Sequence, residues 1–321
     1  MFRVVILGHG DMLSNLIIGT IDAKCKIVGV FRYERLKTCS VYQKIKDFFL
    51  PSKEYSYIKS YGLPEIKSKS ANSEEFKKEL LALNPDIVLV GTWSEKLKKD
   101  IVQLPKIAMI NTHPSLLPKY RGPNPYLQTI WHREEKSGIT FHLMNEKFDA
   151  GAILLQKSVE IKPDDTGKEL KERTVLTARS AVTELLNMLA DDFIIPVDQS
   201  EERATYFPQI TNDDVMLDFK QSAEEISAHI RAFHPWTKTF FSYKNKFFIP
   251  NPYKIEIIEN KTEIKEAGEI TDKNHREKSI TVVCGDGKLI KLSNLKLYGC
   301  FNKPFTSFYI RHFVKKHGNV S

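Results

Sequence analysis

The segment Asp86-Ile87-Val88-Leu89-Val90-Gly91 decides the fold, because its unbroken apolar run is typical of a strand buried on both faces of a sheet. Residues 73–83, just before it, have the apolar spacing of a helix that Asn84-Pro85 ends. Asn72 is expected to cap this helix together with Glu75. A helix that leads directly into a buried strand indicates an α/β domain.

The same arrangement recurs on both sides of this segment. Residues 2–7 and 26–32 predict two more buried strands with a helix over 11–21 between them, and residues 107–110 predict a fourth strand. Strands and helices that alternate at this spacing predict a doubly wound, mostly parallel sheet. Ligands of such sheets bind at the carboxyl ends of the strands.

A glycine-rich turn follows the first predicted strand. Gly8-His9-Gly10-Asp11 invites comparison with the G-x-G-x-x-G fingerprint of dinucleotide-binding proteins. Leu13 occupies the place of the third glycine, and no acidic residue stands directly after the second strand. We therefore interpret the segment as a tight turn between strand and helix, in preference to a cradle for a pyrophosphate.

Two further strands are expected at residues 138–145 and 152–157, which places Asp149 in the connection between them. His142 lies within the apolar alternation of the first of these strands, and we interpret it as a packing residue in preference to a metal ligand.

The chain is predicted to form two domains. Residues 1–190 are expected to form an N-terminal domain that ends in a long helix over 167–189. The polar and acidic stretch 191–204 predicts a linker, and residues 205–321 are expected to form a C-terminal domain.

The C-terminal domain is predicted to be β-rich after a single helix that begins at a capping box of Ser222 and Glu225. A hairpin is indicated by Gly285-Asp286-Gly287. Several short strands in about a hundred residues indicate a small barrel. The expected strands are 239–248, 253–258, 279–284 and 288–298.

The charge, the cysteines and the hydropathy of the sequence indicate which partners and which cellular compartment to expect. The 321 residues carry a net charge of +8, which favours anionic partners such as nucleic acid but equally fits a Lys-rich solvated surface. The cysteines are widely separated and form no C-x-x-C pair, so we expect reduced thiols in a cytoplasmic protein and no metal site. No signal peptide or membrane-spanning segment is expected. The cysteines are Cys25, Cys39, Cys284 and Cys300.

The run Asn111-Thr112-His113-Pro114-Ser115-Leu116-Leu117-Pro118 follows the strand predicted at 107–110. Two residues apart on an extended segment, Asn111 and His113 point to the same face. With the carboxylate of Asp149, they supply an amide donor, an imidazole and an orienting acid, which suffice for acyl transfer without a metal. The structural alternative is that Asn111 closes a turn, that His113 is an ordinary polar residue and that Asp149 forms an Asx turn.

The surrounding residues resemble the 10-formyltetrahydrofolate-dependent formyltransferases, a family that includes the methionyl-tRNA and amino-sugar N-formyltransferases. The first block of the resemblance consists of several segments in order. They are residues 111–118, Lys119-Tyr120-Arg121-Gly122, Gly138-Ile139-Thr140, Met144 and Asp149-Ala150-Gly151. The second block consists of Arg203-Ala204-Thr205-Tyr206, Pro208-Gln209-Ile210, Ile230-Arg231-Ala232-Phe233 and Pro235-Trp236. One departure is Pro114, where the transfer-RNA enzymes often have Gly.

The resemblance implies a fold and a chemistry. It implies a Rossmann-like formyltransferase domain followed by a C-terminal barrel like the oligonucleotide-binding fold. It implies that Asn111, His113 and Asp149 are catalytic and that 10-formyltetrahydrofolate is the formyl donor, with no metal. The residues that it implies as folate contacts are Thr92, Trp93, Ser115, Leu116, Leu117 and Pro118.

The formyl acceptor is expected to be the methionyl amino group of initiator tRNA, because the second block, the net charge and the basic stretch 303–318 all favour it. The alternative is an amino-deoxysugar nucleotide, which Pro114 and the aromatic, basic segment 33–62 favour, since that segment lacks a flexible Gly-rich loop. Two other classes stay open. One is hydrolysis of 10-formyltetrahydrofolate, and the other is a non-catalytic folate or nucleic-acid binder.

Overall fold

The computed structural model describes residues 1–32, 52–259 and 266–297 of the chain, which divides into two compact units. Unit 1 comprises residues 1–125, 136–160 and 171–207. Unit 2 comprises residues 126–135, 161–170 and the chain from residue 208 onward. The domain boundaries proposed from the sequence, 1–190, 191–204 and 205–321, stay a prediction.

Unit 1 is built on a six-stranded sheet with the order β2-β1-β3-β4-β5-β6. The pairs β1/β2, β1/β3 and β3/β4 are parallel, whereas β4/β5 and β5/β6 are antiparallel. This topology confirms the doubly wound, mostly parallel sheet. The strands are β1 (Arg3–Gly8), β2 (Lys26–Arg32), β3 (Ile87–Gly91), β4 (Ala108–His113), β5 (Lys136–Leu143) and β6 (Ile153–Glu160).

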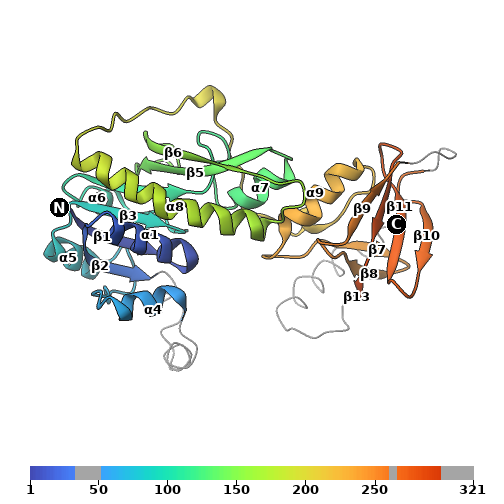
Figure 1. Ribbon diagram of the computed structural model, residues 1–321, viewed down its shortest axis with the longest axis horizontal. Coiled ribbons are helices and arrows are strands. Elements are labelled where there is room, and N and C mark those ends of the chain that lie inside the picture. Colours follow the sequence, from blue (N-terminus) through green and yellow to red (C-terminus); the bar gives the residue numbers. More distant parts are fainter. Residues whose placement is uncertain (33–51, 260–265, 298–321) are drawn as a thin grey trace. The chain divides into compact units, whose positions relative to one another are not determined.

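Helices cover both faces of this sheet because successive strand residues point to opposite sides. Val4 and Ile6 of β1 belong to one buried cluster, which α1 (Gly10–Asp22) and α8 (Gly167–Ala190) cover. Figure 1 shows these two long helices across the sheet. Val5 and Leu7 belong to the opposite cluster, which the shorter α5 (Glu74–Leu83) and α6 (Lys99–Val102) cover.

Two details differ from the sequence predictions. The cap of α5 is Ser73, whose hydroxyl accepts the amide of Phe76 at 3.1 Å. The prediction of Asn72 as the cap was wrong, because its side chain binds Lys96 O and the amide of Lys98 instead. Strand β4 also continues to His113, three residues beyond the predicted end.

The turn after β1 is as tight as predicted. Strand β1 ends at Gly8 and α1 begins at Gly10, so a single residue, His9, joins them.

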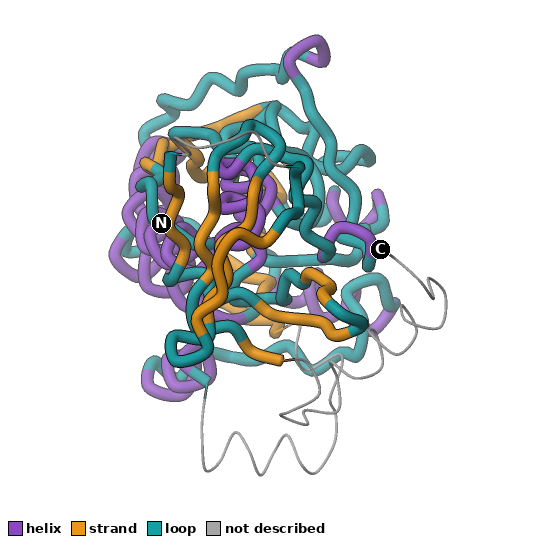
Figure 2. The backbone as a smooth tube through the Cα atoms, turned by 90° about the vertical axis from the view of Figure 1, so that its right-hand side faces the viewer, coloured by secondary structure: helices purple, strands orange, loops and turns teal. Residues whose placement is uncertain are grey.

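The stretch predicted as a linker is part of unit 1. Val197 pairs with Ile153 of β6 through backbone hydrogen bonds of 2.8 and 2.9 Å. We name residues 197–207 the strap. It contains one short helical turn, η1 (Glu201–Arg203), and Figure 2 shows it as loop on either side of that turn.

Unit 2 is β-rich, as predicted. Among the described residues its strands form a four-stranded antiparallel sheet, β10-β11-β12-β9, and a three-stranded sheet, β13-β8-β7. The helix after Ser222 is α9 (Ala223–Phe233), and its capping box with Glu225 is confirmed. The strands are β7 (Phe241–Tyr243), β8 (Lys246–Ile249), β9 (Ile255–Ile258), β10 (Ile270–Asn274), β11 (Ser279–Val283), β12 (Leu289–Leu292) and β13 (Lys296–Leu297).

Turns divide two of the predicted strands of unit 2. Lys244 and Asn245 have φ of 49° and 57°, and this left-handed turn makes residues 239–248 a hairpin of β7 and β8. Asn294, with φ of 56°, separates β12 from β13, which belong to different sheets. Strand β10 was not predicted, whereas the hairpin at Gly285-Asp286-Gly287 is confirmed.

Some predictions fall outside the described residues, namely most of 33–62 and the basic stretch 303–318. Of the former, residues 53–60 form α4 (Lys53–Ser60). Within the described ranges, none of the helices combines the length and the apolar character that a bilayer span requires. The remaining described helices are α7 (Pro125–Trp131) and the short η2 (Asp213–Val215).

Candidate active site

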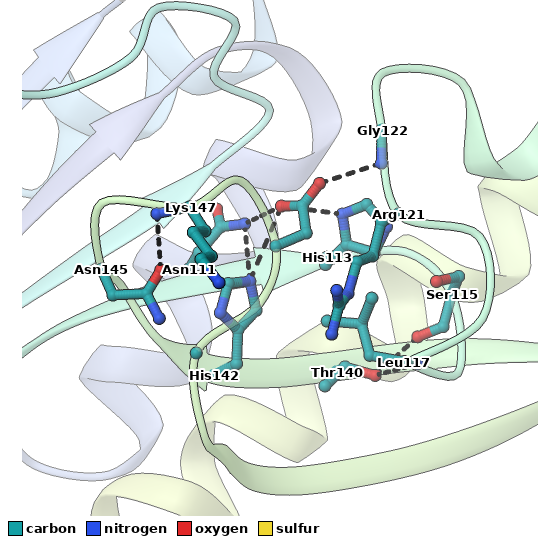
Figure 3. A network of polar contacts seen from close by, with 12 residues as sticks. Asn111, His113, Ser115, Leu117, Arg121, Gly122, Thr140, His142, Asn145 and Lys147 are labelled. Carbon is teal, nitrogen blue, oxygen red and sulfur yellow. Dashed lines mark hydrogen bonds and ion pairs between the residues drawn. The ribbon is translucent and has the colours of Figure 1, made fainter. Parts of the chain in front are cut away.

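The end of β4 carries the first two residues of the site. Because β4 extends to His113, Asn111 and His113 share one face of the strand, while Thr112 points to the other. The antiparallel register of β4 and β5 places Asn111 directly opposite His142 and His113 opposite Thr140. Figure 3 shows Asn111 and His142 pointing toward each other.

Asp149 completes the group that the sequence proposed. Its Oδ1 lies 3.5 Å from Nδ1 of His113 and 3.3 Å from Nδ2 of Asn111. Its Oδ2 accepts the backbone amide of Gly122 at 3.0 Å. The structure therefore brings these three side chains together from two parts of the chain. Asn111 and His113 are labelled in Figure 3.

His113 is buried, and protein groups face both of its ring nitrogens. Nε2 lies 2.8 Å from the carbonyl oxygen of Tyr120, which can only accept, so Nε2 carries a hydrogen. Nδ1 faces Asp149 at 3.5 Å, which is longer than a strong hydrogen bond. This nitrogen is therefore the one that can take up a proton.

His142 is buried, as expected of a packing residue, and its ring also makes polar contacts within this group. Its Nδ1 lies 2.9 Å from the carbonyl oxygen of Leu143 and must donate to it. In the neutral ring Nε2 is then an acceptor, and it lies 3.0 Å from Nδ2 of Asn111 and 3.7 Å from Oδ1 of Asp149. The alternation of β5 alone could not reveal this contact, because it depends on the register with β4.

The surroundings lower the pKa of His113 and also that of Asp149. Burial lowers the pKa of His113 below its ordinary value, although the charge of Asp149 and the carbonyl of Tyr120 oppose this shift. Burial alone would raise the pKa of Asp149, but the charge of His113, the nearby ring of His142 and the hydrogen bond from the Gly122 amide outweigh it and lower that pKa to about 2. At neutral pH we therefore expect a neutral imidazole beside an ionised carboxylate.

One cavity adjoins the group, and a second cavity adjoins the first. The smaller one, about 50 Å³, is lined by Trp93, Leu97 and Phe148 together with Asn111, His142 and Asp149. The larger one, about 860 Å³, shares the residues 96–97 and 144–147 with the smaller and reaches Glu201 of the strap. Only the larger one has the roughly 300–1,000 Å³ typical of ligand pockets.

The six residues proposed as folate contacts occupy different environments. Trp93 lines the smaller cavity, whereas Thr92 is exposed at the end of β3. Ser115 is buried, and its hydroxyl donates to Lys119 O at 2.9 Å. Leu117 is also buried, and its amide donates to Thr140 Oγ1. Leu116 and Pro118 are half-buried in the same loop, and folate contact stays a prediction for all six.

Comparison with known proteins identifies the family. The sequence matches the family described as formyl transferase over residues 2–186, and the formyl transferase C-terminal domain over residues 209–310. The chain belongs to the formyl transferase family. This membership confirms the resemblance seen in the motifs, the fold class, and formyl transfer as the class of reaction.

Curated relatives extend the match along most of the chain. The methionyl-tRNA formyltransferase of Geobacillus thermodenitrificans is 33% identical over 239 residues, 74% of this formyl transferase and 73% of the relative. The methionyl-tRNA formyltransferase of Enterococcus faecalis is 32% identical over 232 residues, 72% of each chain.

Solved structures share the fold at lower identity. The N-formyltransferase from Helicobacter canadensis, in complex with folinic acid and dTDP-3-aminofucose, has a TM-score of 0.68 at 19% identity and covers 93% of this chain and 100% of its own. A sugar 3-N-formyltransferase with dTDP and 5-N-formyl-THF has a TM-score of 0.66 at 16% identity and covers 94% and 99%. These likenesses show the fold of this formyl transferase.

Proposed function

We propose that the protein transfers a formyl group from 10-formyltetrahydrofolate to a primary amine, with Asn111, His113 and Asp149 as its catalytic residues. The observation that carries the proposal is the convergence of these three side chains beside a cavity that adjoins a larger one, at the ends of β3 and β4 where open α/β sheets bind ligands. The folate-bound relatives of similar fold support the choice of donor.

The reaction requires one proton to move from one nitrogen to another. The amine nitrogen attacks the formyl carbon, the carbonyl oxygen becomes an oxyanion, and the bond from carbon to N10 then breaks. The amine loses a proton and N10 gains one. Neutral His113 can accept that proton at Nδ1 and return it, and ionised Asp149 stabilises the imidazolium between the two steps.

Asn111 supplies the donor for the oxyanion in this proposal. Its two amide hydrogens face His142 at 3.0 Å and Asp149 at 3.3 Å. The longer contact is the weaker one, so the formyl oxygen replaces Asp149 there. Such a preorganised donor contributes on the order of 3 kcal/mol to stabilising a transition state.

The acceptor we favour is the methionyl amino group of initiator methionyl-tRNA. The support is the identity of 30–36% with methionyl-tRNA formyltransferases, which includes 33% over three quarters of this chain. The match to the family's C-terminal domain and the net charge of +8 fit the same acceptor.

An amino-deoxysugar nucleotide is the second candidate acceptor. The observation that favours it is that the folds of two sugar N-formyltransferases align with 93% and 94% of this chain, and that one of these structures has an amino-sugar nucleotide bound. Hydrolysis of the donor is a third candidate, in which water replaces the amine.

A direct comparison of acceptors tests the proposal. The full chain is incubated with 10-formyltetrahydrofolate and either methionyl-tRNA or a panel of amino-sugar nucleotides, and the formylated product and free formate are quantified. We expect formyl-methionyl-tRNA, at a rate that falls steeply with salt because phosphate contacts release counterions. A formylated sugar would establish the second acceptor, formate release without acceptor would establish hydrolysis, and no consumption of donor would overturn the proposal.

A further inference from the structure

The strap, residues 197–207, is held against the loop that follows β4 and contains Arg121 and Gly122. The amide of Arg121 donates to Thr205 O at 2.9 Å, and the amide of Phe207 donates to Arg121 O at 3.0 Å. The approach at Gly122 is so close that a Cβ atom there would lie 2.1 Å from Phe207 O. The strap therefore packs on this loop with no space between the two backbones.

One side chain of the strap, Gln199, reaches from this loop to Asp149. Its Oε1 accepts from the buried guanidinium of Arg121, at 3.1 Å from Nε and 2.9 Å from Nη2. Glu201 holds the other edge of that guanidinium at 3.0 and 3.1 Å. Because its oxygen faces a donor, the amide nitrogen of Gln199 must face the other way.

On that other side, Gln199 Nε2 donates to the carbonyl oxygen of Asp149 at 2.8 Å and to that of Gly151 at 2.7 Å. Asp149 has a φ of 53°, in the left-handed region that L-residues disfavour. Gly151 packs so tightly that a Cβ atom would lie 1.8 Å from Leu143 O. Gln199 thus binds both ends of a tight turn whose backbone conformation needs outside support.

We propose that Gln199 is a positioning residue for the Asp149 carboxylate, and that Arg121 fixes the amide of Gln199 in the orientation this requires. Gln199 acts on the backbone of Asp149, and the side chain of Asp149 then meets His113 at one oxygen and the Gly122 amide at the other. A segment predicted as a plain linker thereby becomes part of the active site. The catalytic consequence rests on the function proposed above, whereas the positioning itself does not.

Two substitutions at Gln199 separate positioning from simple packing. Gln199→Glu keeps an oxygen facing Arg121 and adds a favourable charge there, but it turns an acceptor toward the two carbonyl oxygens that Gln199 now binds. Gln199→Ala removes both contacts. Asp198→Ala is the matched control, because Asp198 is the exposed neighbour on the same strap and lies outside the catalytic group.

Hydrogen exchange at single amides, measured by NMR on the full chain, tests whether the Asp149 carboxylate is held in place, and it does not require turnover. In Gln199→Glu we expect at least a tenfold faster exchange of the Gly122 amide, which binds Asp149, and unchanged exchange of the Arg121 and Phe207 amides, which bind the strap backbone. In Gln199→Ala the Gly122 amide should exchange faster as well. Asp198→Ala should match the parent protein at all three amides.

Steady-state kinetics are the second test, and they use whichever acceptor the parent protein formylates. Both Gln199 variants should lower kcat about 10-fold to 100-fold, which is typical when an outer partner of a catalytic group is lost, with little change in donor affinity. If the parent protein transfers no formyl group, the proposed function fails, and hydrogen exchange still decides on Gln199. Unchanged Gly122 exchange in both Gln199 variants, or equal acceleration of all three amides in Gln199→Glu, would overturn the inference.

Discussion

Nδ2 of Asn111 lies 3.0 Å from Nε2 of His142, directly across the antiparallel pair β4 and β5. His142 is oriented in turn by the carbonyl of Leu143, at 2.9 Å from Nδ1. The amide group of Asn111 is therefore oriented by the protein itself, with its hydrogens on the side of Asp149. A donor that is fixed before the reaction loses no free energy to reorganisation during it.

This relationship predicts how His142 variants behave. His142→Ala should lower kcat about tenfold, because Asn111 loses the acceptor that orients it, and KM for the formyl donor should change little. His142→Gln can again offer an oxygen to Asn111 and should recover part of the loss. Steady-state kinetics of both variants check this, and a His142→Ala enzyme with parental kcat would mean that Asp149 alone suffices to orient the amide.

Removing the imidazole of His113 should separate chemistry from binding. In His113→Ala we expect kcat to fall by about 100-fold to 10,000-fold, because proton transfer is lost while the cavities stay intact. The affinity for a folate, measured by calorimetry, should stay within a few-fold of the parent. His275→Ala, at an exposed position of unit 2, is the control. Near-normal turnover in His113→Ala would require a different base.

The depressed pKa of Asp149 makes a prediction about stability in acid. A carboxyl with a folded pKa of about 2 and an ordinary value of 3.8 binds fewer protons when folded than when unfolded. It stabilises the fold fully above about pH 4, and this contribution, about 2 kcal/mol, is lost as the pH falls toward 2. Urea unfolding at pH 5 and at pH 2.5 should show a smaller drop for Asp149→Asn than for the parent. An equal drop in both proteins would show that Asp149 is not stabilised as an anion.

The small cavity beside Trp93 should widen when the donor binds. Its volume of about 50 Å³ is far below that of a pocket for a bicyclic ring, so Trp93 or the neighbouring residues 144–148 must move. We expect 5-formyltetrahydrofolate to change the tryptophan fluorescence of the parent protein. Trp93→Phe should abolish that change, and Trp131→Phe, a variant in unit 2, should keep it. A change that survives Trp93→Phe would place the pterin elsewhere.

Much of the site could be predicted because it depends on local patterns. The spacing of Asn111 and His113 on an extended segment is sufficient to put both on one face, and the buried run Ile87–Gly91 is sufficient to identify a central strand. Asp149 was grouped with them for its chemistry and then supported by the family motif, because no local pattern connects it to a histidine 36 positions earlier.

The rest depends on contacts between distant segments. His142 meets Asn111 only through the register of two strands, and Gln199 meets Asp149 only because the strap lies beside β6. Both were missed for this reason, since polar composition alone makes residues 191–204 resemble an ordinary linker. The prediction of the α5 cap was wrong by one residue, because Asn72 and Ser73 are both good capping residues.

The most direct test of the central claim is a crystal structure with a stable 10-formyl analogue of folate bound. We predict that the formyl oxygen lies about 3 Å from Nδ2 of Asn111 and that the formyl carbon is within reach of both His113 and Asp149. A formyl group bound away from these three side chains, in a complex that still turns over, would contradict it.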